Sequence, residues 1–337
     1  MLKKAMIMAA GVGSRLEPLS SVVPKPLVPL ANMPTMDILV MHLASFGIKD
    51  IVANTYHKAE AIQQHYREHP FDVNFKFIKE LELSGTAGGV KKCQFFFDKD
   101  DDFIIMSGDG LTDVNIEEAY NAHKKSNAIV TIVAKDVAHK EVSKYGIIVP
   151  DKDGYVESFQ EKPSIEEAKS NLANTGIYIF NYKIFNFIPE NTFYDFAKNV
   201  FPSIMESGLK INTYIHTGYW SDIGSLDVYH QSNIDLLNQA INTYKPLVIK
   251  TVDGQYTVGE NTVVPSDTSV VNDCIIGCNC NFGKNVIIKN SIIWDNVEIS
   301  DNVIVENSII LSDMKIENSV KNQIISEEKL KEHLITV

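Results

Sequence analysis

The residues best suited to chemistry stand in the loop after the first apolar run of the chain. Residues 5–8 are apolar without alternation, which predicts a short buried strand of a parallel sheet. The loop that follows combines small residues and glycines with Arg15, and ten residues later Lys25 stands between two prolines. Small residues let backbone N–H groups approach a phosphate closely, and two cations can neutralise a triphosphate. The loop therefore predicts a triphosphate site; a strand–helix turn with a solvated arginine and lysine is the alternative.

Two aspartates stand in predicted loops, and the first of them directly follows a predicted strand. Asp109 follows the apolar run 103–106, and Asp222 lies in the string Gly-Tyr-Trp-Ser-Asp-Ile-Gly at residues 218–224. A carboxylate on the loop after a parallel strand stands where a phosphate-bound Mg²⁺ needs a hard oxygen ligand. A turn or capping aspartate is the alternative for both. Asp113, in the same loop as Asp109, is equally well placed to be the N-cap of a helix that starts near residue 115.

Three further motifs lie in predicted turns. Ser84-Gly85-Thr86-Ala87-Gly88-Gly89 opens a helix and could be a cap with close packing. Gln160-Glu161-Lys162-Pro163 ends a strand, where a solvated Glu–Lys pair is the alternative, and Asn174-Thr175-Gly176 could be a simple left-handed turn. The histidines are scattered, and none pairs with a serine or cysteine as a nucleophile would require.

Residues 5–225 alternate short apolar runs with helical patterns, which is the layout of a parallel α/β sheet. We predict strands at 5–8, 51–54, 75–78, 103–106, 128–133, 146–149, 156–161 and 175–180. Helices are predicted at 35–46, 59–68, 86–93, 116–125 and, with a proline inside it, near 193–207. Because open α/β sheets bind ligands at the carboxyl ends of their strands, the first loop and the Asp109 loop should meet at that edge.

From residue 258 the pattern changes to branched residues every six positions. The strings Asn-Asp-Cys-Ile-Ile at 272–276, Asn-Ser-Ile-Ile-Trp at 290–294 and Asn-Ser-Ile-Ile-Leu at 307–311 stand 18 and then 17 residues apart. Three short faces per coil explain both spacings, and this is the hexapeptide pattern of a parallel β-helix. Cys274, Cys278 and Cys280 lack a fourth ligand for a tetrahedral site, so we expect Cys274 and Cys280 to pack inward. Residues 226–237 predict a helix, followed by a linker.

Length and composition limit the classes of function. The 337 residues suffice for two domains, and 45% hydrophobic with 22% charged residues is typical of a soluble globular protein. The net charge of −12 argues against broad nucleic-acid binding. No apolar run approaches the ~20 residues of a membrane span, and the start lacks the layout of a secretion signal. We therefore expect a cytoplasmic protein that binds neither nucleic acid nor membrane and draws anionic substrates through local cations and Mg²⁺.

Taken together, the first loop resembles the Gly-x-Gly-Ser/Thr-Arg-x-x-Pro-Leu…Pro-Lys-Pro string of the sugar-1-phosphate nucleotidyltransferases. Six matches in the order of that family span residues 9–224, and the layout is most similar to the mannose-1-phosphate guanylyltransferases. Two departures stand in the loop, because Ser14 replaces the usual threonine and Glu17 stands where a basic residue is common. The resemblance implies a Rossmann-like (glycosyltransferase-A-like) α/β domain with a mixed, mostly parallel sheet, plus a C-terminal left-handed parallel β-helix of hexapeptide repeats.

The resemblance also implies a role for each motif. Arg15 would hold the β- and γ-phosphates, Lys25 would reach the α-phosphate, and Mg²⁺ on Asp109 and Asp222 would bridge the phosphate groups. The implied nucleotide-binding positions are Ala9, Ala10, Gly11, Gly13, Ser14, Arg15, Gly85, Thr86 and Gly108. The implied sugar-phosphate positions are Gly146, Glu161, Lys162 and Asn174.

The implied reaction transfers a nucleoside monophosphate from an NTP to a sugar 1-phosphate and releases pyrophosphate. GTP with mannose 1-phosphate is favoured, while UTP, ATP or dTTP with glucose 1-phosphate or another sugar 1-phosphate, including a heptose, stay open. A non-catalytic regulatory or scaffold homologue is the alternative from another class. The domains expected are a nucleotidyltransferase domain over 1–232, a helix and linker over 233–257, the β-helix over 258–325 and a helical tail over 326–337. The solenoid edge and its isoleucine-rich faces suggest homo-oligomers.

Overall fold

The computed structural model describes residues 2–99 and 101–327, and it divides the chain into two compact units. The first unit contains Met1–Gly13, Val23–Leu27 and Thr35–Asp222, and the second contains Ser14–Val22, Val28–Pro34 and the chain from Ile223 onward. Two short segments of the N-terminal region therefore pack with the C-terminal unit, which no sequence pattern indicated. Residues 328–337 of the predicted helical tail lie outside the described residues.

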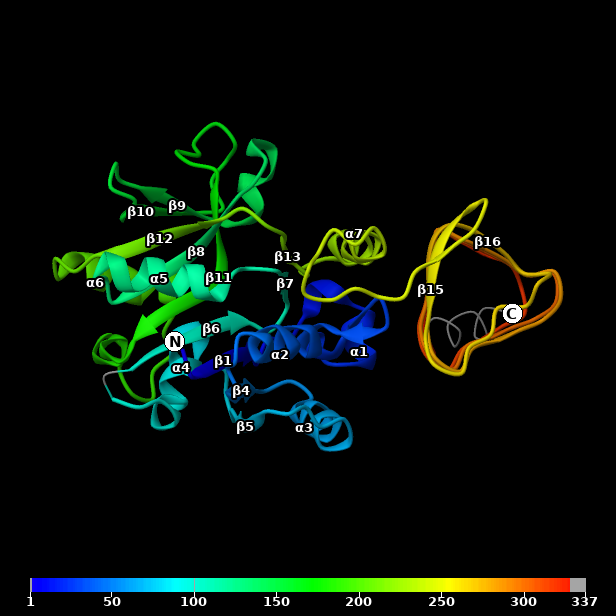
Figure 1. Ribbon diagram of the computed structural model, residues 1–337, viewed down its shortest axis with the longest axis horizontal. Coiled ribbons are helices and arrows are strands. Elements are labelled where there is room, and N and C mark those ends of the chain that lie inside the picture. The colour runs from blue at the N-terminus through cyan, green and yellow to red at the C-terminus, as the bar shows by residue number, and fades with distance from the viewer. Residues whose placement is uncertain (1, 100, 328–337) are drawn as a thin grey trace. The chain divides into compact units, whose positions relative to one another are not determined.

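A mixed sheet forms the centre of the first unit (Figure 1). Its parallel part is, in order, β6 (Asp102–Ser107), β1 (Lys4–Ala9), β4 (Asp50–Thr55) and β5 (Asn74–Lys79). β11 (Leu172–Asn181) runs antiparallel to β6, and the sheet is completed by β8 (Val130–Asp136), β9 (Gly146–Pro150), β10 (Val156–Glu161) and β12 (Ile211–His216). The predicted strands are confirmed. β12 was not predicted, since its residues are only half-buried between its ends.

Both faces of the sheet are buried at the central strands β1, β4 and β6, as apolar runs without alternation predict. In β1, Met6 belongs to one hydrophobic core and its neighbour Ile7 to the other. The core containing Met6 also contains residues of α4 (Gly85–Lys92) and α6 (Phe201–Glu206). The core containing Ile7 is covered by α2 (Thr35–Ser45), α3 (Ala59–Glu68) and α5 (Ile116–Ser126).

Two helix predictions needed correction in detail. The stretch predicted near residues 193–207 is a π-helical turn, Phe196–Val200, followed by α6, whose first turn contains Pro202. A proline fits there because the N–H groups of a first turn have no partner within the helix. The N-cap of α5 is Asn115, whose side chain accepts a hydrogen bond from the Glu118 backbone N–H. The capping alternative for Asp113 is therefore wrong.

A separate two-stranded ribbon follows β6. β7 (Gly110–Thr112) pairs antiparallel with β13 (Trp220–Asp222). The register places Asp222 opposite Gly110 and Trp220 opposite Thr112. The two predicted metal-binding aspartates, Asp109 and Asp222, therefore lie at the same end of this ribbon.

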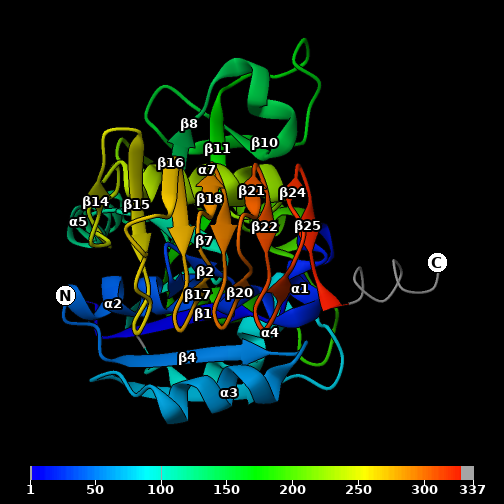
Figure 2. The same ribbon diagram turned by 90° about the vertical axis from the view of Figure 1, so that its right-hand side faces the viewer.

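The second unit contains the predicted parallel β-helix (Figure 2). Its short strands stack in three parallel rows. The first row contains β18 (Ile287–Lys289), β21 (Ile304–Glu306) and β24 (Val320–Lys321), and the second contains β19 (Ile292–Ile293), β22 (Ile309–Ile310) and β25 (Ile324–Ile325). The third row contains β17 (Asn281–Phe282), β20 (Glu298–Ile299) and β23 (Lys315–Ile316). The longer strand β16 (Ser269–Ile276) pairs with the first strand of both of the first two rows, β18 and β19. On its other side β16 pairs with β15 (Gly254–Val258), and β15 pairs antiparallel with β14 (Ile249–Lys250). The coil repeats of 18 and 17 residues are confirmed. The handedness of the coils stays a prediction.

The interior and the corners of the coils follow from the repeat. Cys274 and Cys280 are buried in the β-helix core, as predicted. Asparagines with positive φ stand at successive corners, and their side-chain amides hydrogen-bond from coil to coil, as in Asn279 to Asn296 (3.2 Å). Asparagine tolerates this left-handed conformation better than other residues with a Cβ, so the repeated asparagines are a requirement of the coil geometry.

One face of the β-helix is covered by α7 (Leu226–Leu237), which the sequence predicted. Trp294 Nε1 donates a hydrogen bond to the Tyr229 hydroxyl at 3.0 Å, and Tyr229 is fully buried. The short elements α1 (Leu19–Val22), β2 (Pro29–Leu30) and β3 (Met33–Pro34) belong to the same unit. Among the residues that the structure describes, no helix combines the length and the hydropathy needed to cross a bilayer.

Candidate active site

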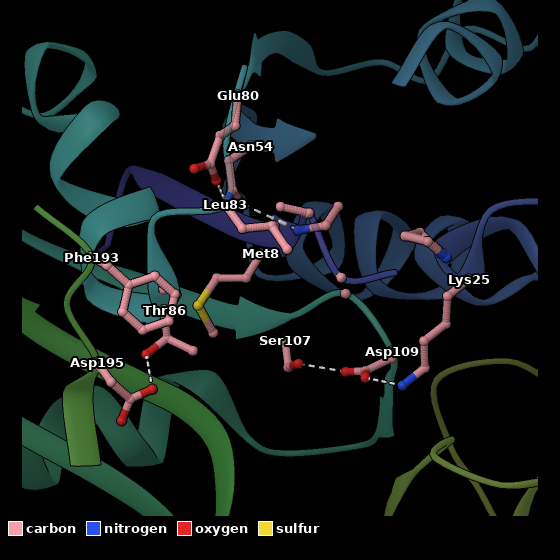
Figure 3. Close-up of a pocket in the computed structure, with 16 residues that line it drawn as sticks. Met8, Lys25, Asn54, Glu80, Leu83, Thr86, Ser107, Asp109, Phe193 and Asp195 are labelled. Carbon is pink, nitrogen blue, oxygen red and sulfur yellow. Dashed lines mark hydrogen bonds and ion pairs between the residues drawn. The ribbon is translucent and has the colours of Figure 1, made fainter. Parts of the chain in front are cut away.

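A cavity of about 370 Å³ opens at the carboxyl ends of β1 and β6 in the first unit (Figure 3). Six of the residues predicted to bind nucleotide line it with their backbone or short side chains: Ala9, Ala10, Gly11, Gly85, Thr86 and Gly108. A side chain at Gly108 is excluded, because a Cβ there would lie 2.8 Å from the Met8 carbonyl oxygen. The structure therefore brings together three loops, at residues 9–11, 85–86 and 108, at the edge where ligands are expected.

Lys25 and Asp109 form an ion pair at one end of this cavity. The Ser107 hydroxyl donates a hydrogen bond to the other oxygen of Asp109. Burial alone would raise the pKa of Asp109, but the charge of Lys25 and the hydrogen bonds from Lys25 and Ser107 outweigh it and hold the pKa below its ordinary value. The cavity thus presents an ammonium group and an ionised carboxylate side by side, and both were predicted.

Asp222 lies beside this pair because β13 places it opposite Gly110, the residue after Asp109. Burial, followed by the carboxylates of Glu141 and Asp222, raises the pKa of Tyr145, so a neutral phenol stands near Asp222. Magnesium sites in phosphate-processing enzymes are typically built from one or two carboxylates together with phosphate oxygens. Asp109 and Asp222 fit that donor set.

A buried polar network that the sequence analysis missed forms another part of the cavity wall. The Asn54 side chain accepts a hydrogen bond from the Ala9 backbone N–H (3.2 Å) and donates one to Glu80 (2.6 Å). Glu80 is 3% exposed and also accepts from the Ser84 hydroxyl and from Lys92 (2.9 Å). The network joins the ends of β1, β4 and β5 to α4. The sequence did contain an indication of this network. Asn54 is a polar residue at the end of a predicted apolar strand, and the end of such a strand lies at the edge of the sheet where ligands bind.

The opposite wall comes from residues 192–196, which the sequence analysis also missed. The Thr86 hydroxyl donates to Asp195 (2.9 Å), and the Tyr194 carbonyl accepts from the Ala87 and Gly88 backbone N–H groups. Gly85 has a φ of +77°, and a Cβ there would lie 2.4 Å from the Tyr194 oxygen. The glycine-rich turn is therefore a close-packing site as well as a part of the cavity wall.

Phe193 projects from this second wall into the cavity (Figure 3). Its side chain is 71% exposed, although it is large and apolar. Leu83 and Met8 lie on the same side of the cavity, away from Lys25 and Asp109. The cavity therefore has an ionic end at Lys25 and Asp109 and an apolar end at Phe193, where Thr86 and Asp195 add polar groups.

The predicted sugar-phosphate residues form a second group. Gly146 and Glu161 stand opposite each other in the β9–β10 pair, and Lys162 follows with a φ of +46°. Asn174 accepts a hydrogen bond from the Gly176 backbone N–H (3.2 Å), and a Cβ at Gly176 would lie 3.1 Å from Ser107. The Asn174 turn is thus brought against the Asp109 loop, although these residues do not line the cavity described above.

The remaining predicted phosphate-binding residues divide between the two units. Gly13 ends a segment of the first unit with a φ of +76°, whereas Ser14 and Arg15 belong to the second unit. The Arg15 side chain is exposed and lies against Gly224, where an added Cβ would be 3.2 Å from the guanidinium. Gly224 leaves room for this arginine next to the N-terminus of α7.

A comparison with known protein families identifies the chain. The model of the nucleotidyl transferase family matches residues 4–239. The chain belongs to this family. It is a sugar-1-phosphate nucleotidyltransferase by the names of its relatives, an enzyme that joins a nucleoside monophosphate to a sugar phosphate.

Three relatives show the range of substrates in this family. A UTP–glucose-1-phosphate uridylyltransferase of Synechocystis is 32% identical over 317 residues, which cover 85% of this chain and 81% of the relative. A glucose-1-phosphate adenylyltransferase of Mycoplasma mobile is 31% identical and covers 86% of both chains. A mannose-1-phosphate guanyltransferase of Yarrowia lipolytica is 34% identical over 266 residues, 77% of this chain and 71% of the relative. These relatives establish the class of reaction and differ in base and sugar.

Proposed function

We propose that the cavity binds the nucleoside triphosphate with its phosphates at the Lys25–Asp109 end and its base at the apolar end. The observation that carries this proposal is the ion pair of Lys25 with Asp109, since it sets an ammonium group beside the loop whose small residues expose backbone N–H groups. Phe193 and Leu83 offer apolar surface for the face of a base. Aromatic side chains stack on any base, so this contact supports nucleotide binding without choosing the base.

In the proposed reaction an oxygen of the sugar 1-phosphate forms a bond to the α-phosphorus, and the bond from that phosphorus to the bridging oxygen of the pyrophosphate breaks. Lys25 neutralises charge at the α-phosphate, and Arg15 holds the β- and γ-phosphates that leave. Lys162 fixes the sugar phosphate, and Glu161 and Asn174 bind sugar hydroxyls. These residues align the reactants and neutralise charge, which is most of what phosphoryl transfer asks of a protein. Mg²⁺, held by Asp109 and Asp222, supplies Lewis-acid stabilisation of the phosphate oxygens.

For the substrate pair we propose GTP and mannose 1-phosphate. Asp195 lines the cavity, and the two oxygens of a carboxylate are hydrogen-bond acceptors. Guanine offers two adjacent N–H donors on one edge, so it suits such acceptors better than uracil, which offers one. A guanyltransferase stands among the relatives. UTP or ATP with glucose 1-phosphate is the second candidate, because the uridylyl and adenylyl relatives cover more of the chain.

Pyrophosphate release with Mg²⁺ tests the substrate pair. The grid combines GTP, UTP, ATP, CTP and dTTP with the 1-phosphates of mannose, glucose, N-acetylglucosamine and a heptose. We expect the GTP–mannose combination to give the highest kcat/KM. A higher value with UTP or ATP and glucose 1-phosphate would replace this pair by the second candidate. Silence over the whole grid, with no thermal shift by any NTP, would favour the non-catalytic scaffold.

We also propose that the enzyme is a homo-oligomer. The parallel rows of the β-helix carry outward isoleucines, of which Ile304 is 40% exposed. Light scattering coupled to size-exclusion chromatography measures the mass directly. A mass near the 37.7 kDa of one chain would contradict the proposal.

A further inference from the structure

A cluster of Asp113 and His216 holds the turn that leads into β13. The Asp113 carboxylate accepts a hydrogen bond from the Tyr219 backbone N–H (2.6 Å), and the Asp113 N–H donates to the Tyr219 carbonyl (3.2 Å). His216 Nε2 lies 2.9 Å from the same carbonyl and 3.3 Å from the Asp113 carboxylate. Because a carbonyl only accepts, the Nε2 of His216 carries the proton. The backbone of one residue, Tyr219, is thus held at both its N–H and its C=O.

The cluster is buried and closely packed. The Asp113 side chain is 9% exposed and the His216 side chain 5%. A Cβ at Gly218 would lie 2.3 Å from the Asp113 carboxylate and 2.6 Å from the imidazole ring. Thr112 adds a hydrogen bond from its hydroxyl to the Tyr219 carbonyl (3.1 Å). A buried carboxylate with this many partners is expensive to leave unpaired, so the turn has one preferred geometry.

The pairing of β7 with β13 alone is too short to fix the register of the two strands. β13 has three residues and pairs with β7 alone, and an isolated two-stranded ribbon is marginally stable in water. A slip of one residue would turn every side chain of β13 to the other face and remove Asp222 from its place opposite Gly110. The contact that fixes the register at the far end is the Asp113–Tyr219 pair. A second contact joins β13 to the main sheet, where Trp220 Nε1 donates a hydrogen bond to the carbonyl of Thr175 in β11 (3.2 Å).

We infer that Asp113 and His216 are positioning residues for the Asp109–Asp222 pair. By holding the backbone N–H and C=O of Tyr219 they fix the register of β13 on β7, and through it the separation of the two carboxylates that take the metal ion. This inference rests on the proposed function, because it assigns these carboxylates to the metal. Partners one step removed from a metal typically change its affinity by about 10- to 100-fold when they are lost.

The test uses the full-length chain and two measurements that do not depend on turnover. Hydrogen exchange follows the backbone amides of residues 217–222, and electron paramagnetic resonance measures Mn²⁺ binding in the presence of GTP. We expect Asp113→Ala and His216→Ala to speed exchange in this segment and to weaken Mn²⁺ binding about 10-fold or more. Asp113→Asn keeps an acceptor oxygen for the Tyr219 N–H, so it should restore most of the affinity.

Asp102→Ala is the matched control. Asp102 is a second buried carboxylate beside a histidine, at the opposite end of β6: its side chain is 4% exposed, lies 3.6 Å from His123 and accepts from Asn181 (2.9 Å) and Lys124 (3.0 Å). Its loss should lower the melting temperature and leave Mn²⁺ affinity within about twofold, since its partners His123 and Lys124 lie on α5 and Asn181 lies on β11, away from the ribbon.

The outcomes separate this inference from the proposed function. Mn²⁺ affinity unchanged in Asp113→Ala, or weakened equally in Asp102→Ala, would overturn the positioning role. Exchange unchanged over residues 217–222 would do the same. If the wild-type chain binds no Mn²⁺ with any nucleoside triphosphate, the metal assignment itself fails, and that result is visible before any variant is made.

Discussion

The two units of this chain use polar side chains in opposite ways. In the first unit the buried polar clusters differ from one another in their residues and contacts, as the network of Asn54 with Glu80 and the cluster of Asp113 with His216 show. In the β-helix the same contact recurs from coil to coil, as in the amide bonds from Asn279 to Asn296 and from Asn290 to Asn307. The varied clusters of the first unit position the residues of the candidate site, whereas the repeated contacts of the β-helix stabilise one coil on the next.

The difference predicts what substitutions will do. A change at the Lys25–Asp109 pair or at Asp222 should alter chemistry more than stability, because the substrates and the metal ion bind there in the proposed function. A change in the repeat should lower stability without altering chemistry, because each coil contacts mainly its neighbours. The variants below test whether effects on catalysis and effects on stability are separate in this way.

The largest effect is expected at the two carboxylates. Asp109→Ala and Asp222→Ala should each lower kcat by about 1,000-fold or more, since removal of one charge-stabilising group typically costs 10²–10³ and the metal site needs both. Steady-state pyrophosphate release measures this, and circular dichroism should show an intact fold.

Asp295→Ala is the matched control in the repeat. Asp295 accepts a hydrogen bond from the Cys278 backbone N–H (2.6 Å) and belongs to a coil. Its loss should leave kcat within about twofold. A wild-type rate in Asp109→Ala or in Asp222→Ala would refute the metal assignment.

The next effect is expected in the β-helix core. Ile310 is fully buried there, so Ile310→Ala should lower the free energy of unfolding by about 3 kcal/mol, whereas Ile310→Val should cost about 1 kcal/mol. Chemical denaturation reports the loss through the fluorescence of Trp294, which belongs to this unit, when Trp220 of the first unit is replaced by phenylalanine. Below the transition kcat/KM should be unchanged in both variants. A parallel fall of kcat/KM would mean that the repeat takes part in the chemistry.

A smaller effect is expected at the apolar end of the cavity. Phe193→Ala should raise the Kd of the nucleotide about 10-fold, because stacking of a base on an aromatic side chain contributes about 1–3 kcal/mol. Calorimetric titration measures the Kd, and Phe193→Tyr should bind as the wild type does. The KM of the sugar 1-phosphate should stay unchanged, since the sugar-phosphate residues lie on other elements. Unaltered nucleotide affinity would show that the base lies elsewhere.

The smallest effect is expected at one corner of the coils. Asn296 has a φ of +59°, accepts from Asn279 and donates to Asp313 (2.9 Å). Asn296→Ala should cost about 1–2 kcal/mol, because it loses these bonds and is strained at this φ. Asn296→Gly removes the bonds and keeps the conformation, so it should cost less. Equal losses in the two variants would show that the conformation adds nothing.

The sequence predicted what depends on local pattern. The buried strands were found because both faces of the sheet are covered, and the coils were found because their repeat is regular. Lys25, Asp109 and the small residues of the first loop, which line the cavity, were predicted because phosphate chemistry needs those residue types after a strand. All of these features are encoded within about twenty neighbouring residues.

What depends on contacts between distant segments could not be predicted. Asp195 lines the cavity only because Thr86, 109 positions earlier, binds its carboxylate. Asp113 looked like a helix cap, and only the approach of Tyr219 gives it another partner. The grouping of Ser14–Val22 with the C-terminal unit likewise depends on tertiary packing. No periodicity or local motif records such contacts.

The close approach of the Tyr194 carbonyl to Gly85 restricts which substitutions the cavity wall can accept during evolution. With 2.4 Å available for a Cβ, any residue other than glycine at position 85 would push residues 192–196 away from α4. The two segments must therefore be inherited together, as a compatible pair. Among relatives, a chain that has lost this glycine should also carry a different length or sequence in the second segment, and its choice of nucleotide is free to differ.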